Sequence, residues 1–254
     1  MAEDKLNILA PLRANLVMVA AGANYMTGLV GNVSIPVYSG GNVGWAGEIE
    51  AAADGAGTFS EVNLEPKRIT AYIDVSKQFL IQDSVSAEAL IRADIVRAIS
   101  NKLEATILGD AAGTNKQPAG LFYDASVLAD TTYSNMVALV RELEEHNVSG
   151  DIKFIVSPEF KAKLKTTPKD AGSGLFVMQN NEVDGLPVLS TSACKGLVLG
   201  NFADYVIGQW GSIDLTIDPY SQATNGKVRL VVNAYFDAKP RRAEAFVVRT
   251  LGDE

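Results

Sequence analysis

The chain has very little of what disulfides, zinc sites and nucleophilic active sites require. Its 254 residues include one cysteine, Cys194, and one histidine, His146. A lone cysteine cannot form a disulfide within the chain, and one cysteine with one histidine cannot supply the ligands of an ordinary zinc site. We interpret Cys194 as a small buried thiol and His146 as a residue at the end of a helix, where the helix dipole favours positive charge.

Long apolar runs and an excess of positive charge are also missing. No apolar stretch approaches the roughly 18 residues that a membrane helix needs, and MAEDKLN is not the basic region of a signal peptide. A net charge of −8 argues against a surface that grips nucleic acid phosphates. The densest basic run is interpreted as a solvated helix face: Lys161, Lys163, Lys165 and Lys169.

Common catalytic and nucleotide-binding motifs are absent as well. There is no nucleophile elbow, HExxH or glycine-rich dinucleotide fingerprint, and GDAAGT lacks the Gly-Lys-Ser/Thr ending of a phosphate-binding loop. One acidic cluster could serve a soluble α/β enzyme: Glu48, Glu50, Asp54 and Glu61. The cluster lies in a Gly/Ala-rich stretch where solvation is the default, so no tuned carboxylate is expected. We predict no enzyme, no cofactor and no metal site.

The segment between Ile69 and Asp110 carries the strongest pattern in the chain. Apolar and polar residues alternate from Ile69 to Val75, which predicts a strand. Beyond Val85 the apolar residues recur every four positions: Ile91, Ile95, Ile99, Leu103 and Ile107. This period predicts an amphipathic helix over residues 86–108, about 35 Å long at 1.5 Å per residue. A helix of that length is expected to act as a spine.

Residues 32–71 are predicted to form an extended hairpin arm. Val33, Ile35 and Val37 alternate in one limb, and the second limb is expected to run on into the strand up to Val75. The stretch between the limbs has too few large apolar residues for a core, and a two-stranded arm alone is marginal in water. We infer that the arm lies on another copy of the protein, although a mobile loop on its own subunit is an alternative. Inter-subunit contact candidates are Trp45, Glu48 and Phe59.

The second half of the chain shows mixed α and β patterns. A helix capped by Ser134 is expected to bury Met136, Leu139, Val140 and Leu143. Further elements follow at residues 153–156 (strand), 158–164 (helix capped by Ser157), 186–190, 197–199 and 205–210 (strands). Two long limbs, 212–221 and 227–240, are joined at Asn225-Gly226, a hairpin signal. Residues 11–31 could be helix or extended chain.

The order of these segments resembles that of a known family. The segments are GLVGNVSIPV, WAGE, TFSEVNLEPKRITAYIDVSKQFLIQDS, the spine helix, LGDAAGTNKQPAGL, DGLPV and EAFVV. Together they resemble the major capsid proteins of tailed phages, which share the Hong Kong phage capsid fold. The resemblance implies an α+β fold with four parts: an N-terminal arm (1–31), a hairpin arm (32–71), a peripheral domain (72–130 and 211–240) and an α/β axial domain (131–210 and 241–254).

The function that the resemblance implies is structural. Copies would join as hexamers and pentamers of an icosahedral virion shell, assembled in the host cytoplasm, that encloses DNA without binding it specifically. Scaffold, portal and decoration proteins are implied as partners, and no membrane. A cellular shell of the same fold, an encapsulin or a gene transfer agent capsid, is the alternative. Some members carry an N-terminal scaffolding region, and the chain is expected to be a mature product, a truncated form or a member with a separate scaffold.

Cross-linking through the arm is predicted to be absent. Some members of the family join subunits by isopeptide bonds from a lysine in the arm, but no lysine lies between Lys5 and Lys67 here. Assembled particles should therefore run as single chains on a denaturing gel. A ladder of covalent oligomers whose linkage maps to the arm would contradict this prediction.

Overall fold

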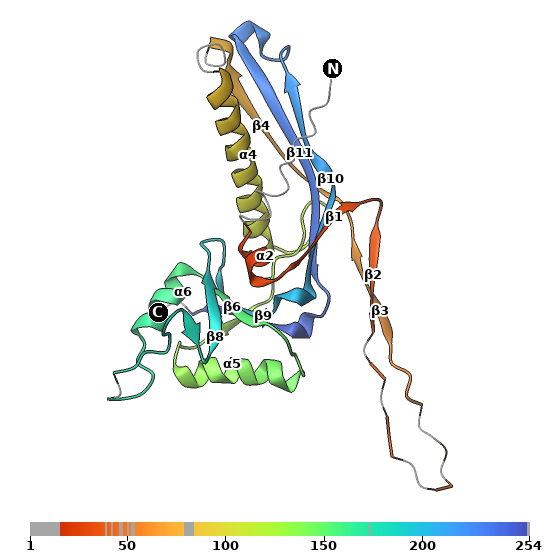
Figure 1. Ribbon diagram of the computed structural model, residues 1–254, viewed down its shortest axis with the longest axis vertical. Coiled ribbons are helices and arrows are strands. Elements are labelled where there is room, and N and C mark those ends of the chain that lie inside the picture. The colour runs from red at the N-terminus through yellow and green to blue at the C-terminus, as the bar shows by residue number, and fades with distance from the viewer. Residues whose placement is uncertain are drawn as a thin grey trace.

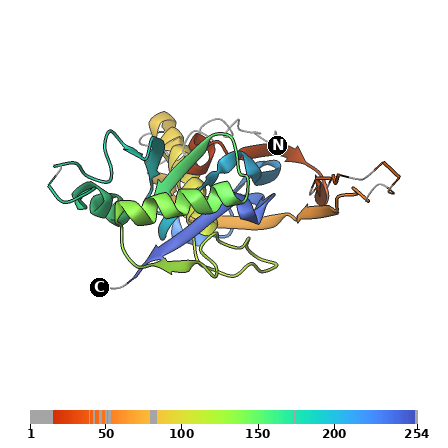
Figure 2. The same ribbon diagram turned by 90° about the horizontal axis from the view of Figure 1, so that it is seen from below.

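The computed structural model describes residues 16–38, 40–41, 43–45, 48–49, 51, 54–78, 84–172 and 174–252, with the side chains of 84–90 and 92 excepted. Figure 1 shows three parts: an elongated body built on α4, a lobe that contains α5 and α6, and a hairpin that leaves the body. Seen from below, the hairpin projects on the side opposite to α6 (Figure 2).

The body is a four-stranded sheet covered on one face by the spine helix. The strand order is β1-β10-β11-β4, and only β1 and β10 are parallel. The elements are β1 (Asn24–Leu29), β4 (Lys67–Ser76), α4 (Ser84–Ile107), β10 (Tyr205–Asp218), the short 3-10 turn η2 (Ala223–Asn225) and β11 (Lys227–Pro240). The predicted spine helix and the turn at Asn225-Gly226 are confirmed, with Gly226 in the left-handed conformation that this turn requires.

Two strand predictions need correction. Residues 69–75 form part of β4, but β4 pairs with β11 in the body and is not the return limb of the arm. Residues 205–210 and the limb from 212 onward, predicted as separate strands, are the single strand β10. Its register shifts between Trp210 and Asp214, and Gly211 adopts a φ of +62° there. A glycine in this conformation lets a strand bulge and bend without ending.

The lobe holds a six-stranded sheet with two helices. Its strand order is β5-β12-β9-β6-β8-β7. The elements are β5 (Ser126–Leu128), α5 (Tyr133–Glu145), β6 (Ile152–Val156), α6 (Pro158–Thr166), β7 (Glu182–Val183), β8 (Leu186–Ser190), β9 (Gly196–Asn201), the 3-10 turns η1 (Phe202–Asp204) and η3 (Ala243–Ala245), and β12 (Phe246–Leu251). Thus β12 returns to the lobe after the two long strands, as the resemblance implies.

The N-cap of α6 was predicted correctly, and that of α5 was not. Ser157 caps α6 by accepting the Phe160 N–H at 3.1 Å, as predicted. The cap of α5 is Thr132 and not Ser134, which lies in the first turn. Asp130 accepts the backbone N–H of Thr132 at 2.9 Å and so starts the helix earlier. His146 is the C-cap of α5, as expected.

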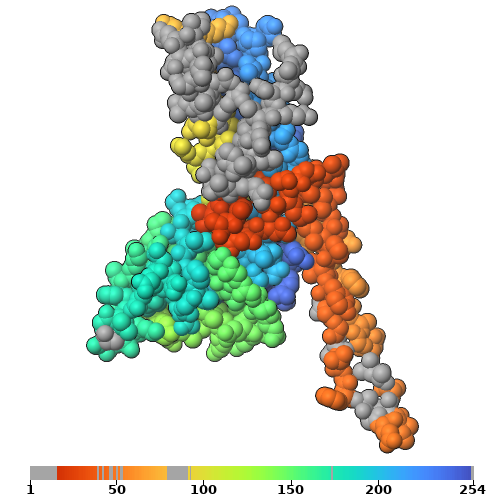
Figure 3. Space-filling model, viewed as in Figure 1, coloured from red at the N-terminus to blue at the C-terminus, as the bar shows by residue number. Residues whose placement is uncertain are grey.

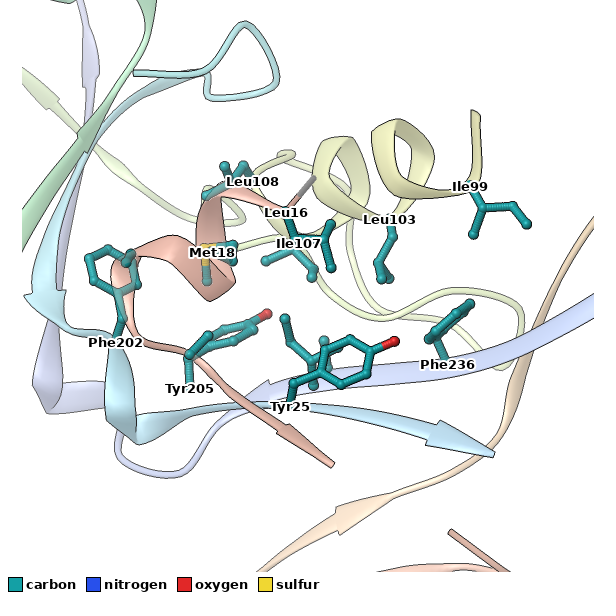
Figure 4. Close-up of a cluster of buried hydrophobic side chains, with 14 of the residues drawn as sticks. Leu16, Met18, Tyr25, Ile99, Leu103, Ile107, Leu108, Phe202, Tyr205 and Phe236 are labelled. Carbon is teal, nitrogen blue, oxygen red and sulfur yellow. The ribbon is translucent and has the colours of Figure 1, made fainter. Parts of the chain in front are cut away.

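A short N-terminal helix joins the body to the lobe. Residues 16–31, whose structure the sequence left open, form α2 (Val17–Ala21) and then β1. Met18 is fully buried in one cluster with Leu103 of α4, Phe202 of η1 and Phe236 of β11. Figure 4 shows these side chains in the layer between α4 and the strands. Because one core contains residues from both parts, the body and the lobe are not independent domains.

A carboxyl group lies inside this junction. Glu104 of α4 is 5% exposed, and it accepts hydrogen bonds from the Thr191 side chain and the Val17 backbone. Among the described residues its Oε1 has no partner. Burial raises the pKa of Glu104 above its ordinary value, since the charged form is poorly solvated there. The spine helix, α2 and the lobe therefore meet at a carboxyl group whose pKa is raised by burial.

We expect Glu104 to make stability depend on pH. A carboxyl whose pKa is raised on folding stabilises the fold below its unfolded pKa and loses this contribution as the pH rises through the folded pKa. Replacement by glutamine should leave the melting temperature of unassembled subunits unchanged near pH 4 and raise it at pH 8. Thermal unfolding at both pH values measures this, with Glu144→Gln on the exposed side of α5 as the control. Equal differences at both pH values would show that Glu104 does not titrate.

Candidate assembly interface

The arm is a two-stranded ribbon with no interior of its own. Strand β2 (Val33–Tyr38) pairs antiparallel with β3 (Phe59–Leu64), from Val33 opposite Leu64 to Tyr38 opposite Phe59. Side chains alternate between the two faces. Val33, Ile35 and Val37 share one face and are only partly buried, whereas their neighbours on the other face are exposed. Figure 3 shows that the ribbon begins against the body and that its outer part projects away from it.

Three side-chain interactions between described residues connect the two limbs of the arm. Ser34 donates a hydrogen bond to Glu61 at 2.8 Å on one exposed face. Further out, the rings of Tyr38 and Phe59 pack with centroids 4.7 Å apart, yet Phe59 remains 79% exposed. The Tyr38 hydroxyl accepts the Gly57 N–H at 3.2 Å. These contacts fix the pairing of the limbs but bury little apolar surface, which is the main source of stability.

Beyond this ring pair the arm carries apolar side chains in full contact with solvent. Trp45 is completely exposed, and Val43 and Ile49 are each more than 90% exposed. Of the predicted contact residues, Trp45 and Glu48 lie in this outer part and Phe59 lies inward of it; all three are exposed. Exposed large apolar groups that gather on one projection are typical of an interaction surface.

The root of the arm, where β3 ends and β4 begins, is held to the body by buried contacts. Leu64, Val206 and Trp210 form a small buried cluster, and the Trp210 Nε1 donates to the Gly31 carbonyl at 2.6 Å. Lys67 and Asp237 form an ion pair of 2.8 Å with side chains 10% and 0% exposed. Asp237 also accepts the Glu65 N–H at 3.0 Å, so the chain that leaves β3 is held to β11. The arm therefore has a defined direction.

The Lys67–Asp237 ion pair was not predicted from the sequence. Lys67 and Asp237 are 170 positions apart, and neither belongs to a motif. The one available signal was an acidic residue in YFDAKP, inside an otherwise apolar strand pattern. Because a buried charge requires a partner, that aspartate pointed to a buried cation elsewhere in the chain without identifying it.

Among the described residues, the side chains considered for an enzyme do not come together in one site. Glu48, Asp54 and Glu61 are exposed along the arm, and Asp54 accepts the Ala56 N–H at 3.0 Å; Glu50 lies outside the described residues. Burial raises the pKa of the Cys194 thiol to about 12, so it is not a thiolate at neutral pH. Within the described ranges no three His, Cys, Asp or Glu side chains gather as metal ligands. Nor does any helix in that part of the chain have the length and apolar character to cross a membrane.

Comparisons with known proteins find matches over most of the sequence. The sequence matches the phage capsid family over residues 6–251. It is 29% identical over 247 residues to the major capsid protein of Halomonas phage phiHAP-1, covering 93% of this chain and 41% of that protein. The match to the major capsid protein of Klebsiella oxytoca phage phiKO2 is 24% identical and covers 87% of this chain and 58% of that protein. The chain thus spans about half the length of these relatives.

Solved capsid structures share the fold at low sequence identity. The capsid of a native GTA particle superposes with a TM-score of 0.76 at 15% identity, covering all of this chain and 94% of that chain. A chain from Microbacterium phage Oxtober96 gives a TM-score of 0.74 at 14% identity, covering 93% and 91%. These similarities confirm the predicted α+β capsid fold, including a projecting arm, a spine helix and an α/β lobe.

We predict that the Lys67–Asp237 pair determines the stability of the arm root. Asp237→Asn leaves a buried ammonium without its counter-charge, which should cost about 3–5 kcal/mol of unfolding free energy. Glu145→Gln removes the partner of Arg141 in an exposed ion pair, with side chains 71% and 65% exposed, and is the matched control. That control should cost less than about 1 kcal/mol. Urea unfolding of unassembled subunits measures both, and equal losses would show that the root is held by its apolar cluster alone.

Proposed function

This chain belongs to the phage capsid family, and we propose that its work is structural: copies join as hexamers and pentamers of a closed icosahedral shell. One observation carries the proposal. The arm has a rigid root, no core of its own and exposed Trp45, Ile49 and Phe59 along its length. Such a ribbon gains stability when it lies across a neighbouring subunit, because only then is its apolar surface removed from water.

The proposed contacts extend beyond the arm. A subunit of a closed shell needs several different interfaces, each of which buries on the order of 1,200–2,000 Å² in total. We assign Trp45, Glu48 and Phe59 to the contact made by the arm, and further contacts to the spine helix region and the lobe. The net charge of −8 suits a shell that encloses DNA without gripping its phosphates.

Partners and setting follow from the same proposal. Assembly takes place in the cytoplasm of the host cell, and the product is the capsid of a virion. Scaffold, portal and decoration proteins are proposed as partners of the shell, and no catalytic activity is assigned to the subunit. A shell with other contents is the second candidate, because the fold is shared with the capsid of a GTA particle. Sequencing of nucleic acid recovered from nuclease-treated particles separates a phage genome from other cargo.

The test of the proposal is the assembly state of the purified chain. Light scattering after size-exclusion chromatography and negative-stain microscopy should show rings or closed shells. A strict monomer at high protein concentration would contradict the proposal. A monomer that turns over a substrate, and loses this activity in Glu48→Gln or Asp54→Asn, would instead establish the enzyme alternative.

Trp45 is expected to matter for assembly and not for folding. Trp45→Ala should abolish or strongly reduce assembly, because it removes the largest apolar side chain of the outer arm. The melting temperature of the unassembled subunit should be unchanged, since this side chain makes no buried contact in the subunit. Trp45→Phe keeps an aromatic ring and should restore most of the assembly. If the Trp45→Ala variant formed normal shells, Trp45 would not be an anchor of the arm contact.

A further inference from the structure

Strand β10 carries two extra residues in the middle of the body sheet. Four steps along β10, from Trp210 to Asp214, lie opposite two steps along β11, from Tyr235 to Asn233. Gly211 adopts a φ of +62° within this bulge. Extra residues in one strand of a pair bend that strand and increase the local twist of the sheet.

A second bulge lies beside the first, in β1. Three steps along β1, from Met26 to Leu29, lie opposite two steps along β10, from Gly208 to Trp210, and Gly28 has a φ of +71°. On the other side of the sheet, β4 pairs with β11 in one continuous register over its whole length. Both bulges therefore lengthen the same side of the sheet at one level, and the bend of the sheet is concentrated there.

One buried amide joins the two bulges. Gln209 lies opposite the bulge of β1 and two residues before Gly211, and it is 1% exposed. Its Oε1 accepts a hydrogen bond from the Tyr25 hydroxyl of β1 at 2.6 Å, and its Nε2 donates to the Gly211 carbonyl at 3.3 Å. A buried amide is costly unless it is hydrogen-bonded, so these two bonds favour the bulged conformation of both strands.

The bend lies between the root of the arm and the far end of the body. On the lobe side of the bend, Leu64 and Trp210 hold the root of the arm. On the other side, β10 and β11 continue to η2 at the end of the body opposite the lobe (Figure 1), where Ile217 is 58% and Tyr220 79% exposed. The bend therefore sets the angle between the arm and this end. Whether a ring of subunits closes depends on the rotation between neighbours, so this angle contributes to the curvature of a shell.

We propose that Gln209 is a positioning residue that fixes the bend of the body sheet and thereby selects the diameter of the shell. Gln209 is buried, so it acts through the shape of the subunit and not through contact with a neighbour. Loss of its bonds leaves the sheet paired, because β4 and β11 run through this level in one register, but it permits a range of angles. Closed icosahedral shells exist only in discrete sizes, so a range of angles gives more than one diameter. This inference rests on the proposed function and adds a determinant of size to it.

Two substitutions at Gly211 separate the bend of the backbone from the bulk of a side chain. A Cβ added there meets no atom within 4 Å, so only the positive φ opposes a substitution. Asparagine tolerates a positive φ, whereas a β-branched residue such as valine does not. Gly211→Asn should therefore form shells of the wild-type diameter, and Gly211→Val should add a second diameter class. Negative-stain microscopy and light scattering measure the diameters, and equal diameters for the two variants would overturn the inference.

The amide itself is tested by Gln209→Met and Tyr25→Phe. Each removes a hydrogen bond of Gln209 with little change in side-chain volume, and each should add a second diameter class. Thr131→Val is the matched control, since it removes the 3.0 Å hydrogen bond to Thr167 in the lobe, away from the bend. All three variants should lower the melting temperature of unassembled subunits, but only the two at the bend should change the diameter. If Gln209→Met does not fold, Tyr25→Phe and the Gly211 pair decide the question.

Three results would contradict the inference and leave the proposed function standing. In the first, Gln209→Met, Tyr25→Phe and Gly211→Val all form shells of the wild-type diameter, which would limit these residues to stability. In the second, Thr131→Val changes the diameter as much as they do. In the third, Gly211→Val folds but forms no particle, which would make the bend a requirement for assembly and not a determinant of size. If wild type itself formed neither rings nor shells, the proposed function would fail instead.

Discussion

A two-stranded sheet has two faces and no inside, and the rest of this structure depends on that constraint. Strands β2 and β3 satisfy each other's backbone hydrogen bonds, but they cannot shield Trp45, Ile49 or Phe59 from water. One cysteine cannot form a disulfide within the chain, and Cys194 is buried in the core that joins body and lobe. Among the described residues no group of His, Cys, Asp and Glu could hold a metal ion. A neighbouring subunit that covered the outer arm would remove these side chains from water, which is the contact we propose.

An arm of this kind is useful only if its direction is fixed. The buried Lys67–Asp237 pair, the Trp210 indole and the Leu64 cluster hold its root against β10 and β11. The same body shares a core with the lobe through Met18 and Phe202, and Glu104 lies within that junction. The subunit consequently presents its arm and its lobe in one fixed relation. Closed shells require this, because small angular errors between interfaces prevent closure.

Local patterns predicted the elements better than their partners. The four-residue period of α4, the alternation in β4 and the Ser157 cap were all readable, because each reflects contacts within a few residues. The pairing of β4 with β11 could not be predicted, because the alternation from Ile69 to Val75 indicates a strand but not the strand with which it pairs. The continuity of β10 depends on one bulge at Gly211, which looks like a turn in sequence.

The sequence likewise predicted some residues of the candidate interface and not others. Trp45, Glu48 and Phe59 could be proposed from composition, because an aromatic or acidic residue in a Gly/Ala-rich stretch stands out locally. The contacts that hold the root of the arm could not, because they join residues from elements far apart in the chain. Lys67 and Asp237, for example, meet only after β4 and β11 have paired.

Amide hydrogen exchange over residues 33–64 tests most directly whether the arm is stabilised by a neighbouring subunit. In unassembled subunits the amides of β2 and β3 should exchange much faster than those of β10 and β11, because the ribbon opens locally at little cost. In assembled particles the same arm amides should become strongly protected while those of the body change little. Equal exchange of the arm in both states would contradict the account.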